Sequence, residues 1–263
     1  VRSGIPVPFH RGDAVLRKHW IIALAVLCVV LAAAVAAAAW LALAGREVLS
    51  SSPESFLRIS GRGIETRPIK GTRARGATAA DDRAAVSSLV SDPKELAEHV
   101  MIVDLERNDL GRVCTVGSVE VTEQARVMSL ATLHHLESRV RGRLRARVGT
   151  AAVLRATFPG GSITGAPKIQ AMRIIAEVEP AARGVYTGAI GAFDGPRRAE
   201  LNVAIRTAVI KDRQLHIQAG AGIVADSQPQ LEWEETMNKG RAIFRAVAMA
   251  EAGIDRHGCG EEG

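Results

Sequence analysis

Apolar residues recur at helical spacing in several stretches of the chain. In one of them, Leu96, Val100 and Val103 form a stripe, and Pro93 stands where a helix can begin. This pattern predicts a helix from residue 93 toward residue 105. The same spacing and start signals predict helices over residues 81–90, 128–147, 151–156, 167–178 and 229–252.

Shorter apolar runs bounded by turn residues predict strands. Residues 48–59 form a strand, a tight turn and a second strand, with Glu54 at the turn. Further strands are predicted over residues 113–121, 184–194, 199–211 and 214–225. Helices combined with antiparallel hairpins indicate an α+β fold, with antiparallel β-sheets flanked by helices.

Residues 20–44 are a run of 25 residues without one charged side chain. A helix of that length spans a bilayer, so the run is a candidate transmembrane helix that precedes the α+β part. A buried core helix and a signal peptide are the alternatives, because the run contains small residues that a signal peptidase accepts. The expected organisation is a basic segment over residues 1–19, the hydrophobic helix over 20–44, a folded domain over 48–250 and a flexible tail over 253–263.

The net charge and the aromatic content indicate what kind of binding partner the chain favours, but they leave several kinds open. The net charge of +6 and a pI near 9.7 suit an anionic partner, which includes a small carboxylate, a nucleic acid and a membrane surface. One tyrosine and five phenylalanines offer little for stacking on bases, so nucleic-acid binding rests on net charge alone. The alternating arginines of residues 139–147 are interpreted as a solvated surface, with a nucleic-acid face as the alternative. Three cysteines without metal-ligand spacing indicate a reducing compartment.

Lys70 lies between a proline and a glycine, in the stretch RPIKGT. Pro68 fixes its own φ and restricts Arg67, while Gly71 permits backbone angles that other residues avoid. This arrangement predicts a turn that displays the lysine. An amine becomes a nucleophile when burial or a nearby cation lowers its pKa, and a solvated turn lysine is the alternative.

Two acidic pairs have the spacing of a shared helix face. Glu95 and Glu98 form the first pair, and Glu232 and Glu235 form the second, with Lys239 one turn further on. Carboxylates on two helices suit Mg²⁺, which completes its ligands with water and an anionic substrate. Solvated helix faces are the alternative.

A glycine loop at residues 160–168 leads into a predicted helix, and free backbone N–H groups favour an anion there. It is neither a Walker A loop nor a dinucleotide fingerprint, and a tight turn is the alternative. Arg206 is expected on one strand face with Asn202, beside a strand over residues 218–223 whose glycines expose backbone N–H groups. His134 and His135 are each a candidate proton carrier or a structural histidine.

Seven longer motifs resemble the chorismate-utilising enzymes, which include anthranilate synthase component I and aminodeoxychorismate synthase component I. The resemblance covers residues 48–248 and rests on RPIKGTRARG, EHVMIVDLERNDLGRV, HHLESRVRG, FPGGSITGAPKIQAM, YTGAIG, IRTAV and QAGAGIVADSQPQLEWEET. It implies the chorismate-binding fold and makes 48–250 a catalytic domain. The large amino-terminal portion of that fold is absent, so the fold is expected to be incomplete, with unpaired strand edges and exposed apolar surface.

The form Pro-Ile-Lys-Gly-Thr resembles aminodeoxychorismate synthase. The resemblance implies that Lys70 adds to C2 of chorismate, that Glu54 protonates the departing C4 hydroxyl, and that ammonia then gives 4-amino-4-deoxychorismate, a precursor of 4-aminobenzoate and folate. His135 matches the active-site histidine. The implied Mg²⁺ ligands are Glu98 and Glu235, with Glu95 and Glu232 nearby. The implied substrate-binding residues are Gly161, Ser162, Tyr186, Arg206, Gly220, Ala221, Gly222 and Lys239.

Ammonia is expected from a separate glutamine amidotransferase subunit. The alternative functions are anthranilate synthase component I and an inactive, membrane-tethered chorismate-binding remnant. The expected location is the cytoplasm, with a membrane anchor through residues 20–44 as the alternative, although a truncated or frame-disturbed chain is the preferred explanation of that segment.

Overall fold

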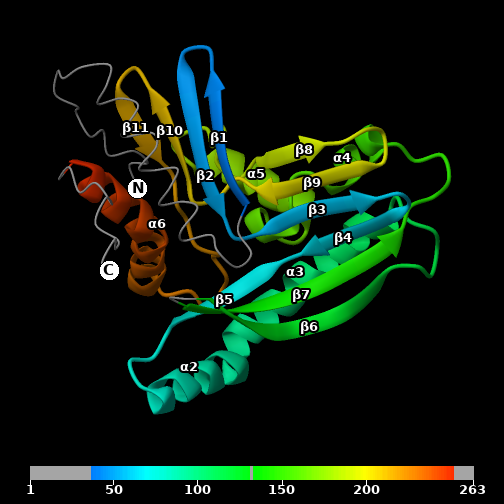
Figure 1. Ribbon diagram of the computed structural model, residues 1–263. Coiled ribbons are helices and arrows are strands. Elements are labelled where there is room, and N and C mark those ends of the chain that lie inside the picture. Colours follow the sequence, from blue (N-terminus) through cyan, green and yellow to red (C-terminus); the bar gives the residue numbers. More distant parts are fainter. Residues whose placement is uncertain (1–36, 131–132, 252–263) are drawn as a thin grey trace, which may run out of the picture. The chain divides into compact units, whose positions relative to one another are not determined.

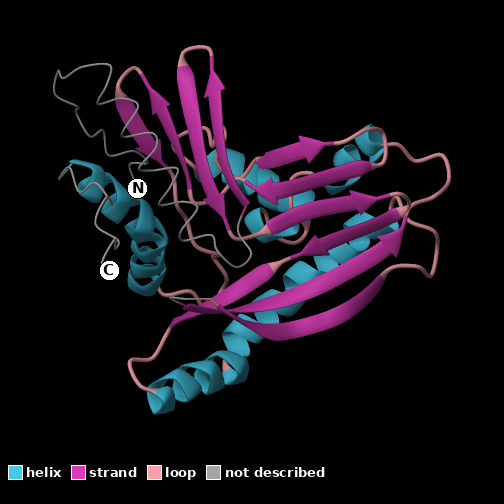
Figure 2. Cartoon of the chain, in the orientation of Figure 1, coloured by secondary structure: helices cyan, strands magenta, loops and turns pink. Residues whose placement is uncertain are grey.

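A computed structural model describes residues 37–130 and 133–251 (Figures 1 and 2). The described residues divide into two compact units. The first unit contains residues 37–53, 183–186 and 204–251, and the second contains residues 54–182 and 187–203. Helices and antiparallel sheets occur in both, which confirms the α+β class.

The first unit is a four-stranded antiparallel sheet with one long helix, α6 (Pro229–Glu251). Its strands are, in sheet order, β1 (Ala37–Leu43), β2 (Arg46–Ser52), β10 (Thr207–Lys211) and β11 (Gln214–Ile217). The carboxyl-terminal half of α6 packs on this sheet and forms a small apolar core. The buried core residues are Leu49, Ala208, Leu215, Ala246 and Val247.

Residues 37–43 are a strand, so the hydrophobic helix predicted over residues 20–44 is wrong across its described part. β1 pairs with β2 in one unbroken register from Ala37 opposite Ser52 to Leu43 opposite Arg46. Gly45, with φ +75°, permits the tight connection between them. Strand β2 therefore supplies the backbone hydrogen-bond partners of residues 37–43, which the apolar run alone assigned to a helix. Residues 1–36 and 252–263 lie outside the described part, and with them the segment 1–19, the rest of the apolar run and the tail.

Within residues 37–130 and 133–251, none of the helices combines the length and hydrophobicity that crossing a membrane requires.

The second unit is a seven-stranded antiparallel sheet with helices against it (Figure 2). The strand order is β5-β7-β4-β3-β9-β8, and β6 also pairs with β7. The strands are β3 (Ser55–Ser60), β4 (Gly63–Arg67), β5 (Ile69–Ala74), β6 (Glu120–Ser129), β7 (Leu133–Arg143), β8 (Ala189–Phe193) and β9 (Arg198–Val203). The helices are α2 (Ala79–Ser91), α3 (Pro93–Gly111), α4 (Thr150–Thr157), the 3₁₀ turn η1 (Gly161–Ile163) and α5 (Lys168–Val178).

Five predicted helices are confirmed, and local signals explain two of their starts. Thr78 caps α2 through a reciprocal bond with Asp81, and the Asp92 carboxylate accepts hydrogen bonds from the first backbone amides of α3. α3 is longer than predicted and packs along β5 and β7 (Figure 1). Its buried face carries Glu98, Glu106 and other polar residues, whereas Val100 of the predicted apolar stripe is exposed.

The helix predicted over residues 128–147 is wrong, because most of this segment is strand β7. β7 pairs with β4 and β5, which are distant in the sequence, and with the neighbouring strand β6. Val140 is buried on one side, while its neighbours Arg139 and Arg141 form ion pairs with Glu65 and Glu123. Arginines at every second position are the period of a strand, and this signal was present in the sequence.

Ion pairs occupy the arginines that a nucleic acid would need. Arg141 Nε lies 2.6 Å from Glu65 Oε2, and Arg139 NH1 lies 2.5 Å from Glu123 Oε1. Burial alone would raise the pKa of Glu65, but hydrogen bonds from Arg141 and Arg67 outweigh it and the net shift is downward. These contacts favour a structural surface over a nucleic-acid face.

Three predicted strands differ from the observed ones. The strand predicted over residues 199–211 is two strands in different sheets, because the chain leaves β9 at Val203 and enters β10 at Thr207. The strand over 214–225 ends at Ile217, and that over 113–121 is reduced to a bridge between Cys114 and Leu144 before β6 begins. The two strands within residues 48–59 are confirmed, but they too belong to different sheets.

Apolar surface is exposed on α5 and β8 of the second unit. α5 has no buried residue, and Ile169 and Val178 on it are 63% and 67% exposed. β8 is an edge strand that carries the exposed Phe193. Exposed apolar side chains and an edge strand are thus present among the described residues, as expected.

Candidate active site

Lys70 lies in strand β5 and not in a turn. Lys70 pairs with Leu136 of β7, Thr72 pairs with His135, and the register shifts between the two pairs. Gly71 occupies this β-bulge with φ +76°, so the glycine supplies the unusual backbone angle that its sequence position predicted. The side chain of Lys70 is only 16% exposed, and its Nζ lies 2.5 Å from Glu98 Oε2. The lysine is therefore packed against an acid and is not displayed to solvent.

Replacing Gly71 with alanine is expected to lower the free energy of unfolding by about 1–3 kcal/mol and to reduce turnover. The new Cβ would strain the backbone at φ +76° and lie 2.9 Å from Leu89 Cδ1 and 3.4 Å from Glu95 Oε2. Denaturant unfolding measures the first effect. Gly61→Ala is the matched control, because Gly61 has φ +61° and open space around it. Equal losses in the two variants, with unchanged turnover, would contradict this role of the bulge.

Glu95 and Glu98 share one face of α3, as their spacing predicted. Glu98 is 7% exposed and also lies 3.8 Å from Lys94 Nζ. Glu95 lies 3.5 Å from Arg73, which binds the helix cap Asp92 at 2.8 Å. The first turns of α3 thus hold carboxylates among three cationic side chains of the same unit.

The two adjacent histidines have different surroundings. His134 is a structural histidine: Ser129 Oγ lies 2.8 Å from its Nδ1, and Asp82 Oδ1 lies 2.9 Å from its Nε2. His135 Nδ1 lies 3.0 Å from the carbonyl oxygen of Gly71, so this nitrogen donates its hydrogen to the bulge beside Lys70. The contact leaves His135 Nε2 as the basic nitrogen of the neutral ring. His135, and not His134, is therefore the candidate for active-site work.

Glu54 is buried, with 5% of its surface exposed, immediately before β3. Its backbone carbonyl accepts a hydrogen bond of 3.1 Å from Val203 of β9, which fixes the chain at this point. A desolvated carboxyl group is what a general acid requires.

The glycine loop is anchored through Lys168. Its ammonium donates to the Pro159 carbonyl at 2.6 Å and to the Thr157 carbonyl at 3.1 Å, and it forms an ion pair with Asp109 of α3. Gly161 packs so closely on α3 that a Cβ there would lie 3.2 Å from Glu106 Cγ. Ser162 Oγ is buried and has no hydrogen-bond partner within the described part of the chain. An oxygen atom of a bound substrate could supply the missing hydrogen bond.

A second group of predicted residues gathers in the first unit. Lys239 Nζ lies 2.6 Å from Glu235 Oε1 and donates to the Gly220 carbonyl at 3.1 Å. A Cβ at Gly220 would lie 3.1 Å from the Tyr186 hydroxyl. Glu232 is buried and accepts a 2.7 Å hydrogen bond from Ser227 Oγ. Tyr186, Gly220, Lys239 and Glu235 are therefore neighbours.

Two expectations for this group are wrong. Arg206 does not share a strand face with Asn202, because it lies between β9 and β10 with φ +48°. Its carbonyl accepts a hydrogen bond from Ser51, so the backbone turns here to change sheets. Residues 218–223 are not a strand either, and Gly220, Ala221 and Gly222 lie in an irregular segment after β11.

Several buried polar residues were missed by the sequence reasoning. Glu106 and Asp109 continue the face of Glu95, Glu98 and Ile102 on α3 at helical steps, and this periodicity was the signal that could have found them. Thr66 of β4 donates a 2.6 Å hydrogen bond to Glu106 Oε2. His99 faces Ser138 at 2.5 Å, and burial, assisted by the charge of Lys70, lowers its pKa to about 4, so it is a neutral contact between α3 and β7.

The acidic pairs fit a magnesium ion in part. Within the described ranges, no cluster brings three histidine, cysteine or acidic side chains into position for a metal ion. Mg²⁺ is commonly held by one or two carboxylates together with water and substrate oxygens, so Glu95 with Glu98, or Glu232 with Glu235, is a suitable partial set.

Comparison with known proteins relates this chain to one family of enzymes. The family model for chorismate binding enzymes matches residues 28–245. The chain is 53% identical to anthranilate synthase component 1 of Pseudomonas putida over 204 residues, which are 78% of this chain and 41% of that protein. It is 49% identical to the same component of Aquifex aeolicus over 205 residues, which are 78% of this chain and 42% of that one. The chain thus spans less than half the length of these relatives.

Solved structures show the same fold. The crystal structure of anthranilate synthase component I from Streptococcus pneumoniae matches with a TM-score of 0.71 and 31% identity, and the match covers 91% of this chain and 59% of that one. The menaquinone-specific isochorismate synthase of Escherichia coli matches with a TM-score of 0.74 and 21% identity over 94% of this chain and 64% of that one, which supports the fold alone. Since the family model for chorismate binding enzymes covers residues 28–245, which is most of the chain, this protein belongs to that family.

Proposed function

We propose that this chain aminates chorismate as a component-1 subunit, with ammonia from a separate glutamine amidotransferase subunit. The observation that carries the proposal is the distance of 2.5 Å between the buried Glu98 of α3 and Lys70 of β5. Strand β5 pairs with β7, which carries His135. Location in the cytoplasm stays a prediction.

The residues of the second unit are assigned to the ring and its leaving group. Glu54 is assigned to supply the proton to the departing C4 hydroxyl, and its burial is the observation that supports this role. The Ser162 hydroxyl and the backbone of Gly161 are assigned to a substrate oxygen at the start of the 3₁₀ turn. His135 is assigned to proton transfer through Nε2, with its ring oriented by the Gly71 carbonyl.

Residues of the first unit are assigned to the substrate carboxylates. Lys239 supplies the charge, and Tyr186 supplies a hydroxyl beside the backbone of Gly220. Glu98 and Glu235, with Glu95 and Glu232, are proposed to hold Mg²⁺. When bound, that ion would supply positive charge for the ring carboxylate.

Anthranilate is the product that the relatives favour. Two of them, at 53% and 50% identity, are named anthranilate synthase component 1. In anthranilate the amino group stands on the carbon next to the ring carboxylate, so this product requires ammonia itself to attack C2 while the C4 hydroxyl leaves as water. The enolpyruvyl side chain is then eliminated as pyruvate, and the ring becomes aromatic.

4-Amino-4-deoxychorismate is the second candidate, and Lys70 is the observation that favours it. If the Lys70 amine forms a bond to C2 while the C4 hydroxyl leaves as water, C2 is blocked and ammonia attacks C4. The lysine then leaves C2 with its electron pair. Lys70 must give up a proton before its amine can attack, and the Glu98 carboxylate at 2.5 Å is placed to accept that proton.

Lys70→Ala separates the two products. Purified protein is incubated with chorismate, Mg²⁺ and ammonium, and the products are resolved by chromatography. If Lys70 is the nucleophile, the variant loses 4-amino-4-deoxychorismate formation by at least about 10³-fold. If the product is anthranilate, the parent forms it and the variant retains it within about tenfold.

Lys94→Ala is the matched control, because Lys94 is a more exposed lysine 3.8 Å from the same Glu98. No product from folded parent protein with ammonium and Mg²⁺ would contradict the proposed function in both forms.

A further inference from the structure

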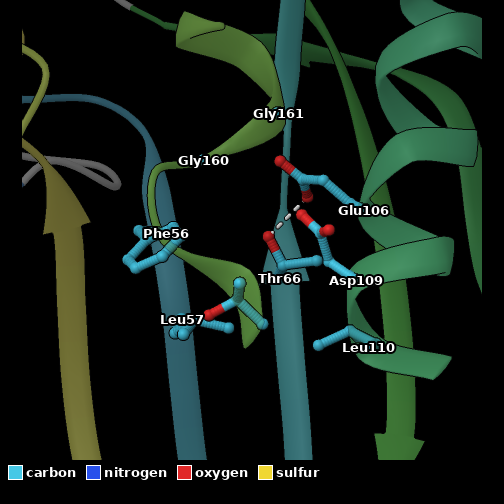
Figure 3. Close-up of a pocket in the computed structure, with 9 residues that line it drawn as sticks. Phe56, Leu57, Thr66, Glu106, Asp109, Leu110, Gly160 and Gly161 are labelled. Carbon is cyan, nitrogen blue, oxygen red and sulfur yellow. Dashed lines mark hydrogen bonds between the residues drawn. The ribbon is translucent and has the colours of Figure 1, made fainter. Parts of the chain in front are cut away.

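A small cavity lies under the glycine loop of the second unit (Figure 3). Its volume open to the centre of a water molecule is about 10 Å³, which is room for a single water molecule. Glu106 and Asp109 from α3 and Thr66 from β4 point toward one another at its wall, and Gly160 and Gly161 cover it (Figure 3). Glu106 and Asp109 thus supply polar atoms on the helix side of the cavity, beside Leu110, and the loop that leads to Ser162 forms part of its lining.

Glu106 is a carboxylic acid at neutral pH. Burial raises the pKa of its carboxyl group to about 8, and the charges of Glu54 and Asp109 act in the same direction. The hydrogen bond from Thr66 and the charge of Lys168 oppose this shift without cancelling it. With Thr66 donating to Oε2, the proton belongs on Oε1, so the neutral group both accepts and donates a hydrogen bond.

The cation whose charge acts on Glu106 is Lys168, and it already interacts with other groups. Lys168 pairs with Asp109 and donates to the carbonyls of Thr157 and Pro159. An ionised Glu106 would therefore face the carboxylates of Asp109 and Glu54 with the Thr66 hydroxyl as its hydrogen-bond donor. A second negative charge in this position is unfavourable at low dielectric constant.

Glu106 lies close to two groups assigned to catalysis, Glu54 and Gly161, and the charge of Glu54 acts on its carboxyl group. Phe56 and Leu57, which follow Glu54 in β3, line the cavity together with Glu106. The stem of Glu106 packs under Gly161, where even a methyl group would come within 3.2 Å of Cγ. A change in the charge or shape of Glu106 thus reaches both Glu54 and the loop.

We propose that Glu106 works as a neutral carboxylic acid that supports the glycine loop and sets the charge beside Glu54, which makes it a positioning residue for the reaction. The inference rests on the proposed function, because it assigns Glu54 and the loop to chorismate.

The pH profile tests the proposal. Wild-type kcat/KM is expected to fall about tenfold per pH unit above about pH 8, as Glu106 ionises. Glu106→Gln keeps the shape and a neutral donor, so its alkaline limb should move up by at least one unit. Thr66→Val should also move the limb upward, because the Thr66 hydrogen bond favours the ionised form. Glu106→Leu should lose at least tenfold at pH 7, and Glu106→Gln should recover most of that loss.

Two readouts do not require turnover. The protonated-carboxyl infrared band at pH 7 should be smaller in Glu106→Gln than in wild type. The unfolding midpoint of wild type should fall relative to that of this variant as pH rises from about 5 to about 8, and the difference should level off above pH 8. Coincident alkaline limbs in wild type and Glu106→Gln, or no difference in the infrared band, would overturn the proposal. Loss of turnover in every protein including wild type would contradict the proposed function, while the infrared band would still decide the state of Glu106.

Discussion

Glu98→Gln is expected to lower kcat/KM for chorismate amination by at least about 100-fold and to raise the Mg²⁺ concentration needed for half-maximal rate. The substitution keeps the shape of a side chain that is 8% exposed but removes its charge. Lys70 then loses its partner at 2.5 Å, and the proposed metal site loses a carboxylate. Initial rates across a Mg²⁺ titration measure both effects.

Glu120→Gln provides the matched control for Glu98, since Glu120 is an exposed carboxylate at the start of β6. It should keep activity within about twofold, as surface substitutions generally do. If Glu98→Gln retained more than a third of the parent activity at the same Mg²⁺ concentration, Glu98 would have no essential role in the reaction.

Lys168→Met is expected to lower the free energy of unfolding by about 3–5 kcal/mol, because it leaves Asp109 buried without its cation. Lys168 and Asp109 are 12% and 7% exposed, and burial already raises the pKa of Asp109. The variant also loses the two hydrogen bonds that hold the start of the glycine loop, so the KM for chorismate should rise. Denaturant unfolding at pH 7 and steady-state kinetics measure the two effects.

The double variant Asp109→Leu with Lys168→Met should recover at least half of the lost stability, since no buried charge then lacks a partner. Lys211→Met, which removes an exposed lysine near Asp212, should cost less than about 0.5 kcal/mol. A loss below about 1 kcal/mol in the single Lys168 variant would show that the ion pair is dispensable for stability.

Local signals in the sequence were sufficient for the helices. α2 and α3 begin where Thr78 and Asp92 can cap them, and α6 begins at Pro229 as its proline predicts. Each of these signals lies within four residues of the feature it sets. A single sequence is therefore enough to find such elements.

The elements that the sequence predicted wrongly are those that pairing with other strands defines. β7 is a strand because β5, β4 and β6 pair with it, and β1 is a strand because β2 pairs with it. The change of sheet between Val203 and Thr207 has no composition signal, since Arg206 takes its unusual φ from the two sheets it joins. Hydrogen bonding between strands decides these segments more strongly than local propensity does.

Among the candidate residues, those in long motifs were predicted from the sequence, whereas those that only their burial distinguishes were missed. Lys70, Glu98 and His135 were predicted, and the structure gathers them on α3 and the neighbouring strands β5 and β7. Glu106 stands in the same motif as Asp104 and Arg107, which form an exposed ion pair on the opposite face. Which acid of a charged run is desolvated depends on the packing of the helix, and the run alone does not reveal it.

The bulge at Gly71 has a consequence for how this family can diversify. Gly71 alone takes the left-handed backbone angle, so the residue at position 70 keeps an ordinary strand conformation that any L-amino acid can adopt. A change of side chain at position 70 therefore leaves the sheet intact, whereas a one-residue insertion or deletion would turn every following side chain of β5 to the other face. A change of chemistry at position 70 therefore requires the replacement of this one residue, and the backbone of the sheet is kept.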